Sequence, residues 1–511
     1  MTTAPVRGKR AADHVHCHEW PAPVSNLYRP ASAADVLQWP VIGRFLRWRH
    51  GRLVLQGALL LAIALLVVDG LTGPQSAARN LATVAPWVHY RGLIVLVLLL
   101  AGNLFCMACP FALPRTLGKR FSRGRSFPLV LRNKWLAIAS LFTLFLLYEW
   151  LDLWASPWLT AWLIIAYFVA SFLLEVAFRE SAFCKYVCPL GSFNFVYATS
   201  APTQIAVKDA EICRHCIGHE CVNGSYAATP MVRLDDIPGG EQVEVRHGPR
   251  GTPGCGTSLF APQIRSNLDC TLCLDCVRAC PHDNIGLMAR RPGRELLQPG
   301  AWPQRLDVSL LVILLAATGL TNAFGMVSPV YALQQSLAEA LNLRSELIVL
   351  LLVFGVTSLL VPALLTLLAA QLGRLLGGSR RKHNLRSTVA AFAPAFVPVG
   401  LGVWIAHYSF HLLIAPFSFI PVLQEFLGQD GDWARFGTSL DETLIGLVQL
   451  VAIAGGLVWS LLIAQRAATR MYRRDAVPGM LPWALLLLAI AFIAVWIFSQ
   501  PMEMRGSILF S

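Results

Sequence analysis

Charged residues are scarce in this chain of 511 residues. Asp, Glu, Lys and Arg together make up 14% of it, whereas a soluble globular protein carries about 25%. Hydrophobic residues make up 55%, and the mean hydropathy is +0.55. A cleavable signal peptide is not visible either, because the first apolar run begins near Leu53, too far along the chain. Most of the chain therefore cannot form a water-soluble core.

Long apolar runs dominate the sequence instead. A membrane-spanning helix needs about 20 predominantly apolar residues, and backbone groups in lipid find their partners only within helices or closed barrels. The runs of this length predict about nine transmembrane helices, at 53–72, 88–106, 135–154, 158–178, 308–327, 347–371, 389–416, 443–464 and 481–500. The predicted fold class is an all-α polytopic membrane protein, with one small polar insert.

Basic residues are concentrated in every second loop between these runs. The loop after the second run carries seven basic residues and no acid, whereas Glu425, Asp430, Asp432 and Asp441 lie before the eighth run. This alternation is the positive-inside pattern. The net charge of +13 therefore indicates topology and not binding to nucleic acid. It predicts a multi-pass protein of the bacterial inner membrane, with a cytoplasmic N-terminus and a periplasmic C-terminus.

One long polar stretch separates the fourth and fifth runs. It is rich in Gly, Pro and Cys, and it has too little apolar surface to fold without something that holds it together. Residues 230–254 within it resemble an inserted loop. The predicted domains are a cytoplasmic tail at 1–52, a four-helix membrane region at 53–189, a cytoplasmic ferredoxin-type domain at 190–303 and a five-helix membrane domain at 304–511.

The cysteines of this stretch follow the spacing of a bacterial ferredoxin. Cys270, Cys273, Cys276 and Cys280 form the run C-x2-C-x2-C-x3-C-P, in which three thiolates hold one [4Fe–4S] cluster and the fourth holds the other cluster of a pair. Zinc is the alternative ligand, but its sites usually consist of two more widely separated C-x2-C pairs. Structural disulfides do not suit a segment that faces the reducing cytoplasm.

A second half-site is therefore expected. Cys213, Cys216 and Cys221 supply three thiolates of this second half-site. Cys255 is the remaining candidate for the fourth ligand of the cluster that the run of Cys270, Cys273 and Cys276 would hold. The predicted ligand sets cross over, in a small α+β ferredoxin-like fold with two [4Fe–4S] clusters. One set is Cys213, Cys216, Cys221 and Cys280, and the other is Cys255, Cys270, Cys273 and Cys276. For Cys255 a buried free thiol is the alternative, because Gly follows it and not Pro.

An internal repeat carries four more cysteines. The second run ends in Phe-Cys106-Met-Ala-Cys109-Pro110, and the fourth is followed by Phe-Cys184-Lys-Tyr-Val-Cys188-Pro189. Similar helical hairpins tend to pack about a pseudo-two-fold axis, which would bring the two pairs together. We expect a third metal centre or a redox-active dithiol set, and four buried small residues are the alternative. The prolines are expected to end the helices and free N–H groups to bond the sulfurs.

These motifs together resemble the NapH-, NosR- and CcoG-type membrane polyferredoxins. The resemblance covers about residues 88–290. It implies membrane-bound electron transfer, with quinol as the donor in the first two types and Cu(II) reduction in the third. The chain departs from the pattern in the two-residue gap of Cys106-x2-Cys109, in lacking a flavin-attachment domain and in its five further spans.

Other possible ligands lie outside the cysteine motifs. His407 and His411 share one helix face, and His89 lies at the start of the second run. They are candidates for haem, copper or quinone binding, or are two histidines hydrogen-bonded between helices. Met502 and Met504 could bind Cu(I). The tail residues His14, His16, Cys17 and His18 could bind a transition metal, although a tail without fixed structure accounts for them equally.

Three functions suit this sequence. The first is an electron-transfer protein that relays electrons between the quinone pool, or another membrane or periplasmic redox partner, and the clusters. The second is a copper reductase or metallocentre assembly factor of CcoG type. The third is a transporter that senses redox state, although the last five runs show no obvious self-similarity of the kind that transporters have.

Overall fold

The computed structural model describes residues 34–114, 121, 125–178, 181–225, 251–298, 300–379, 381–436 and 439–501. Most of the expected loop at 230–254 lies outside these ranges. The same holds for His14, His16, Cys17 and His18 in the tail and for Met502 and Met504.

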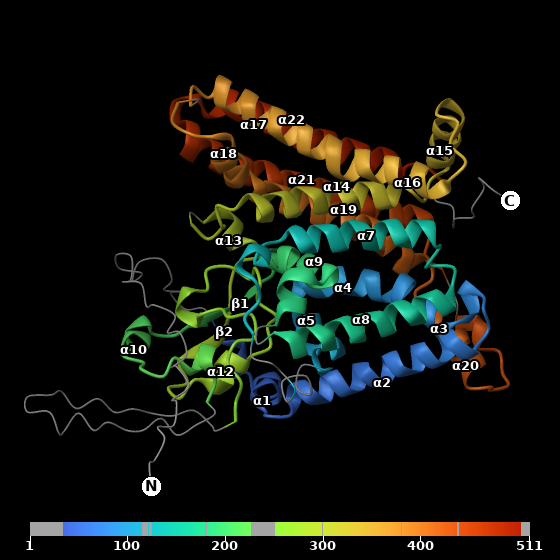
Figure 1. The fold of residues 1–511 in the computed structure, drawn as a ribbon, viewed down its shortest axis with the longest axis horizontal. Coiled ribbons are helices and arrows are strands. Elements are labelled where there is room, and N and C mark those ends of the chain that lie inside the picture. Colours follow the sequence, from blue (N-terminus) through green and yellow to red (C-terminus); the bar gives the residue numbers. More distant parts are fainter. Residues whose placement is uncertain are drawn as a thin grey trace, which may run out of the picture.

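The protein is a bundle of long apolar helices with a small polar part at one end (Figure 1). In the described ranges, seven helical runs are long and apolar enough to cross a membrane. These runs are Gly51–Thr72, Leu81–Leu100, Pro157–Ala177, Leu306–Phe324, Glu346–Leu376, Leu385–Ile414 and Glu442–Phe498. The helices within them are α2 (Gly51–Thr72), α4 (Arg91–Leu100), α8 (Pro157–Ala177), α14 (Leu306–Phe324), α16 (Glu346–Phe354), α17 (Val361–Leu376), α18 (Leu385–Phe392), α19 (Phe396–Ile414), α21 (Glu442–Tyr472) and α22 (Ala476–Phe498). The prediction of a polytopic, mainly helical membrane protein is confirmed.

Three of the predicted spans differ from the others. The run Glu442–Phe498 contains both of the last two, since α21 and α22 pack against each other after a turn at Arg473, where φ is +52°. Helix α7 (Trp135–Trp150) is apolar but has only 16 residues, fewer than the about 20 that cross a bilayer.

The second predicted span, 88–106, has the wrong boundaries. Its helical run begins earlier, at Leu81, and ends at Leu100. The chain then breaks at Gly102, whose φ of +90° is strained for any residue with a side chain. A separate short helix, α5 (Leu104–Ala108), follows and carries Cys106.

The centre of the bundle is formed by α14 and α19. The runs that contain them are 83% and 89% buried inside the protein, against 17% for α2, whose outer face is apolar and exposed. Trp404 of α19 is fully buried and donates a hydrogen bond to the carbonyl oxygen of Leu315, 3.1 Å away. One hydrophobic core joins α4 and α7 to α14, α19, α21 and α22, so both predicted membrane domains share it.

The polar part is built on a two-stranded antiparallel sheet. Strand β1 (Thr203–Val207) pairs with β2 (Ile285–Ala289), with Ile205 opposite Leu287. The cysteine-bearing segments lie between these strands. Three cysteines are on the short helices α10 (Ala210–Arg214), α11 (Glu220–Asn223) and α12 (Asp275–Ala279), and the others are in the non-helical segments around them. The turn between α21 and α22 lies at the same end of the bundle, where Arg470 donates to the carbonyl oxygen of Leu297.

Candidate metal centre

The first cysteine set lines one small cavity in the polar part. Its four members are Cys213, Cys216, Cys221 and Cys280. Cys280 ends α12, far along the chain from the other three, and the antiparallel pairing of β1 with β2 brings it back to them. The geometry therefore groups Cys280 with the earlier cysteines and not with its sequence neighbours, although iron binding stays a prediction.

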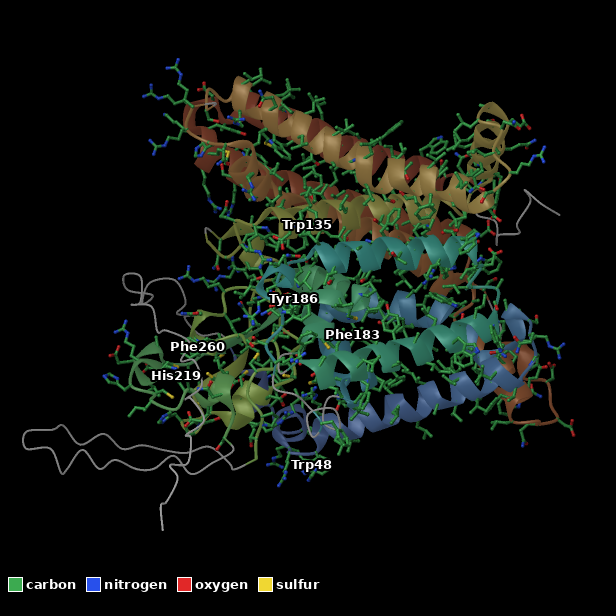
Figure 2. All side chains as sticks on the ribbon, in the orientation of Figure 1. Trp48, Trp135, Phe183, Tyr186, His219 and Phe260 are labelled. Atoms are coloured by element: carbon green, nitrogen blue, oxygen red, sulfur yellow. The ribbon has the colours of Figure 1, made fainter. Side chains whose placement is uncertain are left out.

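Apolar side chains and one amide surround this first set. Phe260 lines the cavity and packs against His219, with ring centroids 5.1 Å apart, as Figure 2 shows. The side-chain amide of Asn284 donates a hydrogen bond to Cys213 Sγ at 3.2 Å. N–H groups that point at thiolate sulfur stabilise its negative charge and tune a bound centre. This donor set fits a cubane.

The second set, Cys255, Cys270, Cys273 and Cys276, is held by an unusual backbone. Leu272 and Leu274, on either side of Cys273, have φ values of +53° and +61°. This left-handed conformation costs a leucine about 1–2 kcal/mol. Strain of this kind persists where the surrounding structure enforces it, often at functional sites. Here it bends the chain sharply within a run that carries three cysteines.

The two sets are adjacent. The N–H of Cys255 donates to the carbonyl oxygen of Cys221 at 2.9 Å, so Cys255 reaches the polar part directly beside the first set. The N–H of Leu259 in turn donates to Cys255 Sγ at 3.3 Å. Cys255 thus lies directly beside the first set and is also a neighbour of Cys276, while its role as a ligand of the second set stays a prediction.

The thiols of both sets lie in an environment that disfavours negative charge. Burial raises the pKa of Cys213 to about 11 and that of Cys221 to about 12. Burial also raises the pKa of Cys276 well above its ordinary value, and the neighbouring thiols Cys273, Cys255 and Cys270 add to this effect. These cysteines are therefore neutral thiols at neutral pH, and they would lose their protons on binding a metal.

The described cysteines are not arranged around a single metal ion. Zinc–sulfur bonds of about 2.3 Å place four tetrahedral sulfurs within about 4 Å of one another. No group of three or more His, Cys, Asp or Glu side chains in the described residues has an arrangement that could hold one ion. A cubane separates its four ligands further, because four iron atoms lie between them. Zinc binding and iron binding by these cysteines therefore both stay predictions.

The hairpin cysteines meet at a third place. Cys106, Cys109, Cys184 and Cys188 line one cavity at the end of the bundle next to the polar part. Figure 2 shows Phe183 and Tyr186, which belong to the π-helical turn Phe183–Val187 that carries Cys184, at this end. The repeat thus brings the two pairs together, as expected, while their role in metal or dithiol chemistry stays a prediction.

The prolines follow the ends of helical segments, as expected. The turn Phe183–Val187 ends at Cys188, directly before Pro189, and Pro189 also begins the next helix, α9 (Pro189–Tyr197), for which Cys188 is the N-cap. The N–H groups in the first turn of a helix have no partner within the helix. One of them, that of Gly191, donates to Cys188 Sγ at 3.2 Å. The side chain of Asn194, also on α9, donates to Cys106 Sγ at 3.4 Å.

Two cations join the hairpin cavity to the second cysteine set. Arg52, at the start of α2, lines the cavity, and its Nη1 lies 2.8 Å from Asp275 Oδ2, one residue before Cys276. Lys134 is almost fully buried, and its Nζ lies 2.5 Å from Asp269 Oδ1 and 2.7 Å from the carbonyl oxygen of Lys185. The hairpin cavity and the second set are therefore held in contact.

Sequence reasoning did not find these two cations. In the sequence, Arg52 is one of several basic residues of the N-terminal tail, and Lys134 is one of the seven in the loop after the second run. Both lie at the start of an apolar helix. Basic residues are common at this position because they fix the orientation of a span in the membrane. The sequence therefore does not distinguish a basic residue that sets topology from one that belongs to a site. A third residue, Arg91, was also missed, although the sequence marks it as a candidate functional residue. It is the lone charge inside the second apolar run, and a charge at that depth is costly and usually functional.

We predict that Arg52→Gln lowers the reduction potential of the second centre alone, because a nearby cation stabilises the more negative, reduced state. The expected shift is tens of millivolts, where about 59 mV corresponds to a tenfold change for one electron. A redox titration followed by electron paramagnetic resonance measures it. Arg214→Gln, an exposed change beside Cys213, is the control and should leave the second centre unchanged. Equal shifts in both variants would contradict this role.

The candidate histidines are buried but do not form one site. His407 and His411 on α19 have ring centroids 5.3 Å apart, and His407 Nε2 lies 3.2 Å from Met326 Sδ. His89 instead packs edge-on against Phe419, with Nδ1 3.1 Å from the carbonyl oxygen of Val84. His411 lines a separate cavity together with Met326, and neither His407 nor His89 lines that cavity. Haem, copper and quinone binding by these histidines stay predictions.

Comparisons with known proteins give no further information on the function of this chain. No protein-family model matches the chain, and no curated protein or solved structure matches it either. The residues and their geometry are therefore the basis for a function.

Proposed function

We propose that this protein is a membrane-bound iron–sulfur electron-transfer protein. Two [4Fe–4S] clusters would be held by the crossed cysteine sets of the polar part, which would have a ferredoxin-like fold. The four hairpin cysteines would form an intermediate redox site between those clusters and a membrane partner such as a quinol. This is the arrangement that the resemblance to the NapH-, NosR- and CcoG-type polyferredoxins implies.

One observation carries the proposal. Twelve cysteines in the described ranges are free of disulfides, and they gather in three adjacent groups of four at one end of an apolar bundle. A cubane uses four thiolates, so each group has the number of donors that one centre needs. Contact between the hairpin cavity and the second set, through Arg52 and Lys134, supports a continuous path for electrons.

The proposal also assigns an orientation. The basic turns and the polar part lie at the same end of the bundle, and the positive-inside pattern would make that end cytoplasmic in a bacterial inner membrane. The C-terminus would then be periplasmic.

We therefore predict that reporter enzymes fused after Arg381 or Arg474 report a cytoplasmic location, because both positions lie in basic turns. A fusion at Asp430, in an acidic loop, is expected to report the periplasm. Activity of a phosphatase fusion and fluorescence of a green fluorescent protein fusion, measured in parallel, check the two sides. A periplasmic signal from within the polar part would overturn the orientation.

A second function is favoured by one contact. Met326 Sδ lies beside His407 Nε2, and a thioether with imidazoles suits Cu(I). This arrangement supports the copper reductase or metallocentre assembly factor. No described feature favours the redox-sensing transporter.

One experiment separates the first two functions. Protein purified anaerobically in nanodiscs is reduced with dithionite, freed of excess reductant and mixed with either a naphthoquinone or Cu(II). The relay predicts rapid return of the visible absorbance of oxidised clusters with the quinone. Rapid reoxidation by Cu(II), without rapid reoxidation by the quinone, would favour the copper function. Protein without clusters would exclude both mechanisms as proposed.

A further inference from the structure

A cavity of about 300 Å³ lies inside the bundle, next to the hairpin cysteines. Residues of α2, α4, α7, α8, α9 and α19 line it, and nearly all of them are apolar or aromatic. This volume is in the range of cavities that bind small organic ligands. Among the described residues that line it, Arg91 alone carries a charge.

Arg91 has aromatic neighbours in place of a counter-ion. Its side chain is 6% exposed, and Nη1 donates to the hydroxyl of Tyr148 at 3.1 Å. Its Cζ lies 4.3 Å from the ring centroid of Tyr148 and 4.5 Å from that of Trp87. Within the described part of the chain, no carboxylate forms an ion pair with it. Aromatic faces stabilise a cation, but they leave its N–H groups able to donate to a ligand oxygen.

The depth of Arg91 limits what that ligand can be. Arg91 lies in the middle of the apolar run Leu81–Leu100, about 14 Å along the helix axis from Leu100. The phosphate of a lipid headgroup stays at the bilayer surface, so it does not reach this depth. A charged side chain here is costly and usually serves a function. A hydrocarbon-soluble ligand with an oxygen acceptor fits both the cavity and the cation.

The cavity shares a wall with the hairpin cysteines. Phe105, Phe111 and Leu190 line both spaces. Asn194 lines the larger cavity and donates its side-chain N–H to Cys106 Sγ. A ligand in the cavity would therefore be separated from the thiol site by the side chains that line both spaces.

We propose that this cavity binds the ring of a membrane quinone, with a ring oxygen on Arg91 and Tyr148. The inference rests on the proposed function and names its membrane partner and binding site. Oxidation of one quinol to quinone breaks two O–H bonds and releases two electrons and two protons. The electrons would pass across the shared wall to the hairpin site, and the two clusters, if held by the crossed cysteine sets, would each take up one of them.

The protons have a separate route. Trp87 and Tyr148 also line a second cavity of about 220 Å³, on the side away from the cysteines. His411 and Met326 line it, and it extends to the exposed residue Ala78. The two protons leave through this cavity while the electrons leave toward the polar part, so charge separates along the bundle. Reduction of quinone would take both routes in reverse.

Photoaffinity labelling in nanodiscs tests the site. The probe is an azido-naphthoquinone, with unlabelled naphthoquinone as competitor, and labelled peptides are identified by mass spectrometry. Labelling is expected on the segments that contain Trp87, Phe111 or Tyr148. Arg91→Gln should reduce labelling about tenfold, the effect of losing one charge-assisted hydrogen bond.

A matched pair of variants on α2 controls for general damage. Ile63 lines the cavity, whereas Leu61, two residues away, is 64% exposed on the outer face. Ile63→Trp should fill the cavity and abolish specific labelling, and Leu61→Trp should leave it unchanged. Equal labelling in both, or labelling confined to the segment of His407, would overturn the inference. Iron measured on the same samples separates the two proposals: labelling without iron would refute the clusters alone, and iron without labelling would refute the quinone site alone.

Discussion

Replacing Cys280 with Ser should remove one cluster and leave the other, despite its place in the run of Cys270, Cys273 and Cys276. Cys280 lines the cavity of Cys213, Cys216 and Cys221, so the first centre loses a ligand while the second keeps all four. Iron should fall by about four atoms per chain. Electron paramagnetic resonance of the reduced protein should show loss of the magnetic coupling between two adjacent centres.

Cys276→Ser is the matched variant, four residues earlier on α12. It should damage the second centre and leave the first. If Cys280→Ser and Cys276→Ser damage the same centre, the crossed grouping does not describe the ligands. Cys17→Ser, which changes the cysteine farthest from these motifs in the sequence, should leave the iron content unchanged.

Removing Cys106 and Cys184 together should block electron transfer between the membrane and the clusters. Each cysteine comes from one hairpin, and both line the shared cavity, so the double change to Ser takes one sulfur from each side of the site. The ferredoxin-type centres should still assemble, because their ligands lie elsewhere. The rate of cluster reoxidation by naphthoquinone is expected to fall by at least about a hundredfold, with the visible spectrum of the clusters retained.

The same variants show what the hairpin site contains. If it holds a cluster, the unaltered protein binds iron beyond about eight atoms per chain, and the double variant loses that excess. If it is a dithiol set, iron stays near eight and thiol titration changes with redox state. Ser181→Ala changes the wall of the same cavity without removing sulfur and should transfer electrons normally. Full activity in the double variant would refute both forms of the site.

Sequence patterns predicted most of the helices and the grouping of the cysteines, because both depend on the spacing of residues along the chain. Apolar length located the helices, and the repeat around Cys106 and Cys184 predicted that the two pairs would meet. The spacing around Cys280 predicted its grouping with distant cysteines, which the strand pairing of Ile205 with Leu287 brings about. In each case the signal is a fixed separation along the chain.

The features that the sequence did not predict depend on tertiary contacts. The break at Gly102 interrupts an apolar run that reads as continuous, because the left-handed conformation of one glycine is not visible in hydropathy. Arg52 has the same sequence context as any basic residue before a span, and only the fold places it beside Asp275. The histidine pair gave a clear helical pattern, yet the large cavity is built around Arg91 on another helix.

Iron and acid-labile sulfide, counted in anaerobically purified protein together with its resonance spectrum, test the central claim most directly. Two cubanes predict about eight iron and eight sulfide per chain, with signals of two interacting [4Fe–4S] centres after reduction. A chain that carries zinc in place of iron, or iron without sulfide, would contradict the assignment of the crossed cysteine sets.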